Sequence, residues 1–290
     1  MDKDKGILIA DAGGTSTRWC LVGCDGVLKQ DVGSVPVNVC VSSDEELSAA
    51  FASVSSLLRS ASELYFYGAG CAGTRECERL ALCLRESGYD GIPEVYSDMT
   101  GAARALFGDK PGLACILGTG SNSCLYDGSG ITDNIPPLGY ILGDEGGGAS
   151  IGKRFLKRLI RGDLPKDLSD EFFAREDLTV SDIYAKVYRE PRANRFLAGF
   201  ARFVHEHSDR PEMRAIAEES FAEFFSLIAH GYGDLRECPV GFVGSVAYYF
   251  DTLLRAVASR YGIQITDIEL TPMDGLIRYH SGHKYKKTDK

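Results

Sequence analysis

The residues of this chain best suited to bind phosphate lie in two matching stretches of glycine and hydroxyl residues. The first is Gly14-Thr15-x-Thr17-x-x-Cys20-Leu21, and the second is Gly118-Thr119-x-Ser121-x-x-Cys124-Leu125. A glycine at a bend lets backbone N–H groups come close to a ligand, and Thr or Ser hydroxyls add donors, so such turns form concave anion sites. Either stretch alone could be a structural turn. Two matched copies instead predict two loops that bind the phosphates of one nucleotide from both sides.

Two acidic residues lie where they could serve phosphoryl transfer. Asp11 ends the apolar run before the first loop, where its carboxylate could hold a magnesium ion through water, whereas the run before the second loop ends on Leu117. Asp98 ends a predicted strand and begins a predicted helix, which places it at the edge of the sheet where ligands bind in such folds. A carboxylate that accepts the hydroxyl proton is the acid–base function that transfer to an alcohol requires. The alternative role for Asp98 is a helix N-cap.

These residues must be positioned by strands and helices, and the hydrophobic pattern predicts two successive α/β halves. The first half opens with three strands, residues 6–11, 17–23 and 27–35, joined by the glycine loop and by an Asp-Gly turn suited to a hairpin. A helix that Ser43 can cap follows within residues 42–62, because apolar residues recur there on one helical face. Two strand–helix units then complete the half: 63–67 with 74–88, and 93–98 with 99–108.

The order of elements then restarts. The expected elements of the second half are a strand–glycine loop–strand–turn unit (112–131), a glycine-rich loop (138–152), a helix (152–161), a mostly helical segment (165–235), a strand–turn–helix unit (239–250) and a late strand (262–272). The sequence therefore predicts a domain-level duplication. We expect one α/β domain over residues 1–110, completed by a C-terminal helix at 274–290, and a second over residues 111–273.

Composition narrows the class of partner. The chain has 290 residues, 25% of them charged, with a formal net charge of −9, which argues against a nucleic-acid partner because such binding rests on Lys and Arg. No apolar run approaches the ~20 residues of a membrane span, and we see no signal-peptide pattern.

The nine cysteines contain no Cys-x-x-Cys pair and lie mostly in apolar runs, so we expect buried, reduced thiols in a cytoplasmic protein. The basic tail that begins at His280 is expected to be a solvated terminus.

Competing motifs are weaker. The Gly-x4-Gly-Lys-Ser/Thr pattern of P-loop enzymes does not occur in the sequence. The stretch GAGCAG (68–73) matches a dinucleotide-binding pattern, but a tight turn is the better interpretation because its unit is not the first of its domain. GASIG (148–152) matches a hydrolase motif but follows a loop rather than a strand, and HEH (205–207) lacks the second ligand pair of a zinc site.

With these residues in place, the chain resembles the actin-like sugar kinase superfamily, and within it the BadF/BadG/BcrA/BcrD ATPase family that includes N-acetylglucosamine kinases. ADAGGTSTRW is similar to the family's first phosphate loop, SDMTGAARAL to its catalytic-aspartate segment and ILGTGSNS to its second phosphate loop. GYILGDEGGGASIG resembles its Gly-Asp-Glu-Gly motif and GFVGSVA its adenosine loop. The five segments stand in the family's order over almost the whole chain. The resemblance implies two actin-like ATPase (ribonuclease H-like) domains with a cleft between them.

The resemblance also implies roles, with ATP and Mg²⁺ as cofactors and an amino sugar as the small-molecule substrate. Asp98 would be the base for the acceptor hydroxyl, and Asp11 would serve the magnesium ion. The residues that would contact ATP are Gly13, Gly14, Thr15, Gly118, Thr119 and Gly120 at the phosphates and Gly244 and Ser245 at the adenosine. The residues that would bind the sugar are Asn38, Thr119, Gly143 and Asp144. The expected reaction is phosphorylation of N-acetylglucosamine to its 6-phosphate, and a homodimer remains open.

The chain departs from the family at one sugar-site position. Many members carry Gly-Trp-Gly before the Gly-Asp-Glu-Gly motif, whereas this chain has Pro137-Leu138-Gly139. The identity of the sugar, and of its N-acyl group above all, is therefore open. Two other functions remain as alternatives, an ATPase that activates a partner redox enzyme and a non-catalytic sugar sensor. The first would use Cys pairs for an iron–sulfur cluster, for which we find no equivalent in the sequence, and an intact Asp98 argues against the second.

Overall fold

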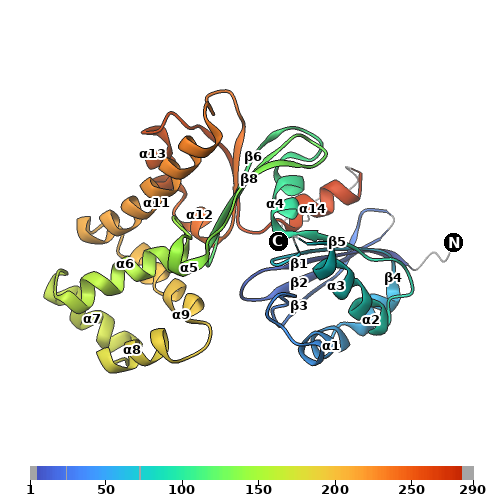
Figure 1. The fold of residues 1–290 in the computed structure, drawn as a ribbon, viewed down its shortest axis with the longest axis horizontal. Helices are drawn as coiled ribbons and strands as arrows, with labels where there is room; N and C mark the ends of the chain where they lie inside the picture. The colour runs from blue at the N-terminus through green and yellow to red at the C-terminus, as the bar shows by residue number, and fades with distance from the viewer. Residues whose placement is uncertain (1–4, 24, 72, 283–290) are drawn as a thin grey trace. The chain divides into compact units, whose positions relative to one another are not determined.

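A computed structural model describes residues 5–23, 25–71 and 73–282. The chain divides into two compact units (Figure 1). Unit 1 takes in the described residues of Met1–Pro111, Tyr126–Ile131 and Thr271–Lys290, and unit 2 takes in Gly112–Leu125 and Thr132–Leu270. Each unit contains one five-stranded sheet with helices packed against it.

The sheet of unit 1 has the strand order β3-β2-β1-β4-β5. Its strands are β1 (Gly6–Ala12), β2 (Thr17–Val22), β3 (Leu28–Ser34), β4 (Ala61–Gly68) and β5 (Glu94–Ser97). The first three form antiparallel hairpins, whereas β4 runs parallel to both β1 and β5. The helices of this unit are α1 (Asp44–Ala52), α2 (Ser55–Ser60), α3 (Thr74–Glu86), α4 (Asp98–Phe107) and α14 (Met273–His280).

Alternation along β1 and β2 gives this sheet two apolar faces. Leu8 and Trp19 on one face pack with residues of α1, α2 and α3, and the Trp19, Phe51 and Phe66 rings meet edge to face. Ile9 and Cys20 on the other face pack with residues of α4 and α14. The sheet is therefore the middle layer of three, and α4, which begins at Asp98, is held from the same side as α14.

The sheet of unit 2 repeats this order. Its strands are β6 (Gly112–Leu117), β7 (Ser121–Tyr126), β8 (Ile131–Ile135), β9 (Val240–Val243) and β10 (Ile265–Glu269). They lie in the order β10-β9-β6-β7-β8. If the strands of each unit are numbered along the chain, both sheets have the order 3-2-1-4-5, read from β3 in the first sheet and from β8 in the second. The parallel pairs β6–β9 and β9–β10 match β1–β4 and β4–β5. The predicted duplication is thus confirmed in the strand order.

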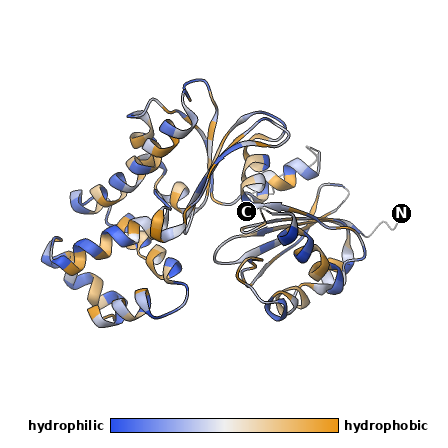
Figure 2. Ribbon diagram, in the orientation of Figure 1, coloured by the Kyte–Doolittle hydropathy of each residue, from blue (hydrophilic) through white to orange (hydrophobic). Residues whose placement is uncertain are grey.

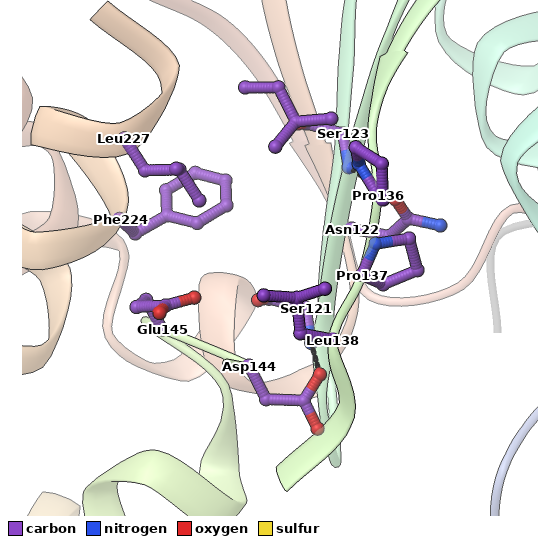
Figure 3. A pocket seen from close by; sticks show the side chains of 11 residues that line it. Ser121, Asn122, Ser123, Pro136, Pro137, Leu138, Asp144, Glu145, Phe224 and Leu227 are labelled. Carbon is purple, nitrogen blue, oxygen red and sulfur yellow. Dashed lines mark hydrogen bonds between the residues drawn. The ribbon is translucent and has the colours of Figure 1, made fainter. Parts of the chain in front are cut away.

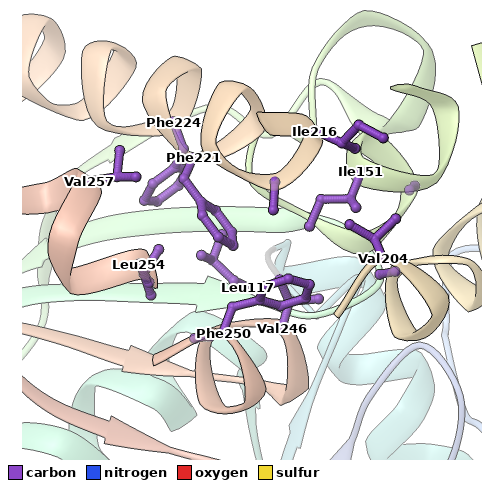
Figure 4. Packing of buried hydrophobic residues seen from close by; sticks show 14 of the residues in the cluster. Leu117, Ile151, Val204, Ile216, Phe221, Phe224, Val246, Phe250, Leu254 and Val257 are labelled. Atoms are coloured by element: carbon purple, nitrogen blue, oxygen red, sulfur yellow. The ribbon is translucent and has the colours of Figure 1, made fainter. Parts of the chain in front are cut away.

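Nine helices accompany this second sheet in the part of the chain that the structure describes. They are α5 (Gly139–Leu142), α6 (Gly148–Arg161), α7 (Lys166–Glu176), α8 (Val180–Tyr188), α9 (Ala193–Gly199), α10 (Ala201–Glu206), α11 (Pro211–Tyr232), α12 (Ser245–Tyr249) and α13 (Asp251–Ser259). Phe221 and Phe224 of α11 pack with Leu117 of β6 and with residues of α6, α12 and α13 in one buried cluster (Figure 4). Hydrophobic residues follow the strands and one side of the helices, with polar residues on the other (Figure 2).

Most predicted elements are confirmed, and five details are corrected. The run 42–62 forms two helices, α1 and α2, although the Ser43–Glu46 capping box at its start is present. Helix α6 begins at Gly148, four residues before the predicted start, and the short α5 interrupts the glycine-rich loop. Strand β8 was not predicted. Five of the eight described cysteines are buried, but Cys40 is exposed; Cys24 lies outside the described residues.

The fifth correction concerns His280, which belongs to α14 and is partly buried. Its Nε2 lies 2.7 Å from the Tyr67 hydroxyl, and its ring stacks on Tyr65. Arg104 of α4 donates to the same hydroxyl at 2.9 Å and lies over the Tyr96 ring. Burial and the Arg104 charge lower the pKa of His280 to about 4, so the imidazole is neutral. Residues 283–290 of the predicted tail and helix lie outside the described residues.

Among the residues described, none of the helices combines the length and the apolar composition that a membrane span requires.

Candidate active site

The first glycine loop joins β1 to β2 in unit 1. The Gly13 N–H donates to the Ser16 carbonyl at 3.0 Å, which closes the turn, and Gly13, Gly14 and Thr15 are exposed. The hydroxyl of Thr17, the first residue of β2, is buried and accepts from the Val37 N–H at 3.1 Å. The loop therefore presents Gly14 and Thr15 to solvent, while Thr17 holds the segment that contains Val37.

Asp98 is the first residue of α4, and the structure excludes its role as an N-cap. The cap is Ser97, whose side chain accepts from the Thr100 N–H at 3.1 Å. The Asp98 carboxylate accepts from the Met99 N–H at 2.9 Å, and burial raises its pKa above the ordinary value. Asp98 is thus at the carboxyl end of β5 with a side chain that the helix cap does not require.

Asp11 lies one residue before the end of β1, in register with Arg18 on β2 and Tyr67 on β4. Burial and the negative charge of Asp98 raise its pKa to about 7, and Arg18 opposes that shift. Arg18 is itself paired with Asp31 at 2.7 Å. The two carboxylates therefore repel one another, and a bound cation would reduce that repulsion.

The donor set around Asp11 fits a magnesium ion held mainly through water. Within the described chain there is no cluster of three or more His, Cys, Asp or Glu side chains that could hold a metal. Mg²⁺ commonly binds through one or two carboxylates while keeping several waters and substrate phosphate oxygens. Asp11 supplies one such carboxylate, and it does not offer the N or S donors that zinc prefers.

Asn38 lies in a turn that is held against the glycine turn after β4. Its Oδ1 accepts from the Cys40 N–H at 3.0 Å, and a Cβ on Gly70 would lie only 2.7 Å from that Oδ1. Gly70 also has a φ of +86°, so both its conformation and the close approach require glycine. The described residues 68–71 of the stretch GAGCAG therefore form the predicted tight turn.

Arg79 of α3 fixes the segment that carries Asn38, and this role was not predicted from the sequence. Its guanidinium donates to the carbonyls of Val39 at 2.6 Å and Ser42 at 2.9 Å, and it pairs with Asp44 at 2.6 Å. A charged guanidinium on two carbonyls of one turn restricts that turn. No pattern within the sequence predicts this contact, because it joins elements from different parts of the unit.

The second glycine loop joins β6 to β7 in unit 2 and is bonded to the start of α6. The Gly118 N–H donates to the Gly120 carbonyl at 3.0 Å. The carbonyls of Gly118 and Thr119 accept from the Gly148 and Ala149 N–H groups at 2.8 and 2.9 Å. The positive end of the α6 macrodipole therefore lies at this loop, which favours a negatively charged ligand there.

Gly244 and Ser245 lie beside the second loop. Gly244 has a φ of +124°, and a Cβ on it would collide with the Leu117 carbonyl immediately before that loop. Its N–H donates to the Glu269 carbonyl at 3.0 Å, and Ser245 begins α12. The predicted adenosine residues and the second phosphate loop thus lie together within unit 2.

Asp144 lies against the same loop. It has a φ of +59°, and its Oδ1 accepts from the Ser121 N–H at 3.4 Å (Figure 3). A Cβ on Gly120 would lie 2.7 Å from the Asp144 carboxylate, and one on Gly147 would lie 2.6 Å from the Gly120 carbonyl carbon. Burial raises the pKa of Asp144 above its ordinary value. Two glycines are therefore needed for the segment that carries Gly143 and Asp144 to approach the loop.

The structure thus gathers the predicted residues into two groups, one in each unit. Unit 1 holds the first loop, Asp11, Asn38 and Asp98. Unit 2 holds the second loop, Gly143, Asp144, Gly244 and Ser245.

Solved structures provide the comparison with known proteins. A candidate N-acetylglucosamine kinase from Porphyromonas gingivalis is 39% identical, with a TM-score of 0.90 over 95% of this chain and 99% of that one. A second candidate N-acetylglucosamine kinase, from Chromobacterium violaceum, is 18% identical with a TM-score of 0.74 over 96% and 99% of the two chains. A ROK family glucokinase from Streptomyces griseus, solved with glucose and AMPPNP, is 14% identical with a TM-score of 0.60 over 94% and 97%.

No family model and no curated protein matches the chain. The likenesses below 25% identity establish only the fold, whereas the 39% identity extends over nearly the entire chain. The predicted actin-like α/β fold is confirmed. The chain therefore belongs to the N-acetylglucosamine kinase-like group of the BadF/BadG/BcrA/BcrD ATPase family, within the actin-like sugar kinase superfamily.

Proposed function

We propose that this ATP-dependent carbohydrate kinase phosphorylates an amino sugar, and that N-acetylglucosamine is converted to its 6-phosphate. The observation that carries the proposal is the position of Asp98, whose carboxylate is not used to cap α4. Its carboxylate lies at the carboxyl end of β5, where open α/β sheets bind their ligands, and Ser97 rather than Asp98 caps α4. The P. gingivalis relative, itself a candidate N-acetylglucosamine kinase, supports the choice of sugar.

The two glycine loops would bind the phosphates of ATP through backbone N–H groups and hydroxyls. In unit 1 these are the exposed groups of Gly14 and Thr15, beside Gly13, whose own N–H closes the turn. In unit 2 they are the groups of Thr119 and Gly120, beside Gly118, whose N–H closes that loop, and the α6 dipole adds to the attraction there. Gly244 and Ser245 would contact the adenosine. A magnesium ion held near Asp11 would neutralise charge on the transferring phosphoryl group.

The sugar would be held by Asn38 from unit 1 and by Thr119, Gly143 and Asp144 from unit 2. Asp98 would accept the proton of the primary hydroxyl as that oxygen attacks the γ-phosphorus, with ADP as the leaving group. A raised pKa suits this role, because a base works best when its pKa approaches the working pH. Positioning and charge stabilisation would supply most of the rate, as in other phosphoryl transfers.

An ADP-release assay over a panel of sugars tests the proposal. The panel contains N-acetylglucosamine, glucosamine, N-acetylmannosamine, N-acetylmuramic acid, glucose and mannose. We expect N-acetylglucosamine to stimulate ADP release most, with mass spectrometry and NMR placing the phosphate on O6 of the product. Uniform background rates over the whole panel would overturn the proposal and favour an ATPase that serves a partner protein.

A further inference from the structure

The helix that begins with Asp98 is held in unit 1 by a group of polar side chains that the proposed chemistry does not use. We call this group the Tyr67 cluster, and it consists of Tyr67 on β4, Arg104 on α4 and His280 on α14. Tyr67 is fully buried, and the other two side chains are partly buried. The Tyr67 hydroxyl bonds to both partners, so it joins α4 and α14, which lie side by side, to the sheet (Figure 1).

The hydrogen bonds of the Tyr67 cluster run in one direction. A guanidinium can only donate, so Arg104 Nη1 donates to the Tyr67 oxygen at 2.9 Å. The Tyr67 O–H then donates to His280 Nε2 at 2.7 Å, which accepts because the imidazole is neutral. The Arg104 guanidinium also lies 4.0 Å from the centre of the Tyr96 ring, a cation–π contact. Any rotation or sliding of α4 would therefore break several contacts at once.

Two glycines bring α4 close to its neighbours. A Cβ on Gly101, one turn after Asp98, would lie 3.0 Å from the Tyr67 ring. A Cβ on Gly275 of α14 would lie 2.3 Å from the Ala105 carbonyl oxygen of α4. Such close packing leaves α4 little space to shift toward β4 or toward α14. The Tyr67 cluster opposes movement in the other direction, away from the sheet.

The Tyr67 cluster connects the strand that carries Asp11 with the helix that carries Asp98. Asp11 on β1 is in register with Tyr67 on β4, and Tyr67 is in register with Tyr96 on β5. Asp98 follows Tyr96 by two residues. The position of Asp98 relative to Asp11 therefore depends on how α4 is held against β4.

Stability alone does not require a polar cluster at this place. Apolar side chains of similar shape fill such a space with little or no loss of stability. Arg104 Nε is buried and has no hydrogen-bond partner among the described residues, which lowers stability further. What a buried polar network adds is one defined arrangement of the elements that it joins. The Tyr67 cluster thus favours a fixed position of α4 over maximal stability.

We propose that Arg104 is a positioning residue that, through Tyr67 and His280, holds α4 so that the Asp98 carboxylate meets the acceptor hydroxyl of the substrate. This inference rests on the proposed function, because it assumes that Asp98 is the base. Arg104 acts on the rate through Asp98 and has no part in binding ATP or sugar. The last described helix of unit 1, α14, thereby supports the base from the other end of the chain.

A matched pair of tyrosines on β4 tests the inference. Tyr67→Phe removes one oxygen atom and with it the bonds to both helices. Tyr65→Phe also removes one oxygen atom, which donates to Glu63 at 2.8 Å, and keeps the ring that stacks on His280. We expect Tyr67→Phe to lower kcat at least about tenfold, because a displacement of about 1 Å lowers a rate by up to about 100-fold. Tyr65→Phe should keep kcat within about twofold.

Substitutions of Arg104 test the named residue directly. Arg104→Met keeps most of the alkyl stem and removes every donor, so kcat should fall at least about tenfold. Arg104→Lys keeps a charge and a donor for the Tyr67 hydroxyl, so it should recover at least about threefold of that loss. The KM values for ATP and sugar should stay within about threefold in all these variants. A loss in kcat with an unchanged KM indicates an interaction that matters only in the transition state.

The same substitutions in an Asp98→Asn background separate positioning from a general structural effect. If Arg104 acts through the base, Arg104→Met should lower the remaining kcat less than about twofold once the base is gone. An equal factor in both backgrounds would overturn the inference, because a general structural effect does not depend on Asp98. If thermal unfolding shows that Arg104→Met does not fold, Tyr67→Phe provides the same comparison.

The inference and the proposed function fail in different ways. If sugar stimulates ADP release but Tyr67→Phe and Tyr65→Phe have the same kcat, the Tyr67 cluster does not position the base and the proposed function stands. If no sugar stimulates ADP release, the proposed function fails, and this inference fails with it because there is no base to position.

Discussion

Replacing Asp98 by Asn should separate catalysis from folding more cleanly than any other single change in this chain. The amide oxygen that this substitution introduces can still accept the Met99 N–H bond that the carboxylate accepts at 2.9 Å. The cap of α4 is on Ser97 and stays intact. The substitution therefore removes little except a negative charge and a proton acceptor.

The expected effects on rate and on stability have opposite signs. Loss of a general base costs about 100- to 10,000-fold in kcat, which is about 3 to 5 kcal/mol of activation free energy. Burial raises the pKa of Asp98, so at neutral pH the folded state holds an ionised carboxylate less favourably than the unfolded state does. Asp98→Asn removes that penalty, so the thermal midpoint should be unchanged or higher.

The assay combines steady-state ADP release with thermal unfolding, and Ser97→Ala is the control. Ser97 Oγ accepts from the Thr100 N–H and lies 3.0 Å from the Thr100 hydroxyl. Its loss should cost about 1 kcal/mol of unfolding free energy. The midpoint should then fall by about 2 to 4 °C. Ser97→Ala should therefore lower the midpoint with a small loss of kcat, which is the reverse of Asp98→Asn.

Two results would refute this reasoning. If Asp98→Asn kept more than about a tenth of the unaltered kcat, Asp98 would not be the base, since base removal costs more than that. If it lost activity together with a midpoint as low as that of Ser97→Ala, the carboxylate would be serving the fold rather than the chemistry. An ATP affinity within several-fold of the unaltered protein completes the expected pattern.

Three further predictions concern other parts of the proposed machinery. Asp11→Asn should raise the magnesium concentration for half-maximal ADP release at least about tenfold, because one of the few carboxylate ligands is lost; an unchanged magnesium titration would contradict the metal role. Gly120→Ala should raise the KM for sugar, because the new Cβ would lie 2.7 Å from the Asp144 carboxylate. A sugar titration at saturating ATP measures this KM. An unchanged KM would show that the Asp144 carboxylate can move away from the new Cβ and still bind the sugar as well as before. His280 has a pKa lowered to about 4, so folded protein resists its protonation and stability is lost as pH falls from about 6.5 toward 4. The excess unfolding free energy of the unaltered protein over His280→Gln, from urea titrations, should therefore shrink over that range, and a constant difference would mean that burial and the Arg104 charge do not lower the pKa of His280.

Local patterns in the sequence were enough to predict the strands, the two loops and most helices. The capping box at Ser43 and Glu46 is readable from residue types alone, and it is present. The division of that helix into α1 and α2 was not predicted, although the residues explain it. Ser53 donates its hydroxyl to the Ala50 carbonyl at 2.6 Å, which competes with the helix, and the β-branched Val54 follows.

Strand β8 shows what local patterns miss and what the repeat could have supplied. Ile131–Ile135 is polar and largely exposed, so it has no alternation of buried and exposed residues to reveal a strand. The first half has a strand directly after Asp25-Gly26, and β8 follows the matching Asp127-Gly128. Extending the repeat by one element would have predicted it.

The positions of Asp11, Asp98 and the glycine loops in the fold were predictable, because they follow from the ends of strands and from turn residues. The supporting contacts were not. Arg79 holds the turn of Asn38 from 40 positions away, and His280 meets Tyr67 across 213 positions. Such partners are chosen by the packing of helices on a sheet, which no spacing rule in the sequence records.

The late position of α14 in the chain has a consequence for synthesis on the ribosome. Met273, Leu276 and Ile277 pack on the same face of the first sheet as Ile9 and Cys20, so α4 alone covers part of that face until α14 exists. At ~5–20 residues per second, the interval from β1 to α14 is on the order of 10 to 50 s. The whole of unit 2 is synthesised within that interval. A nascent chain thus carries a partly exposed apolar sheet face until its last described helix is made, and such transiently exposed surface is prone to aggregation.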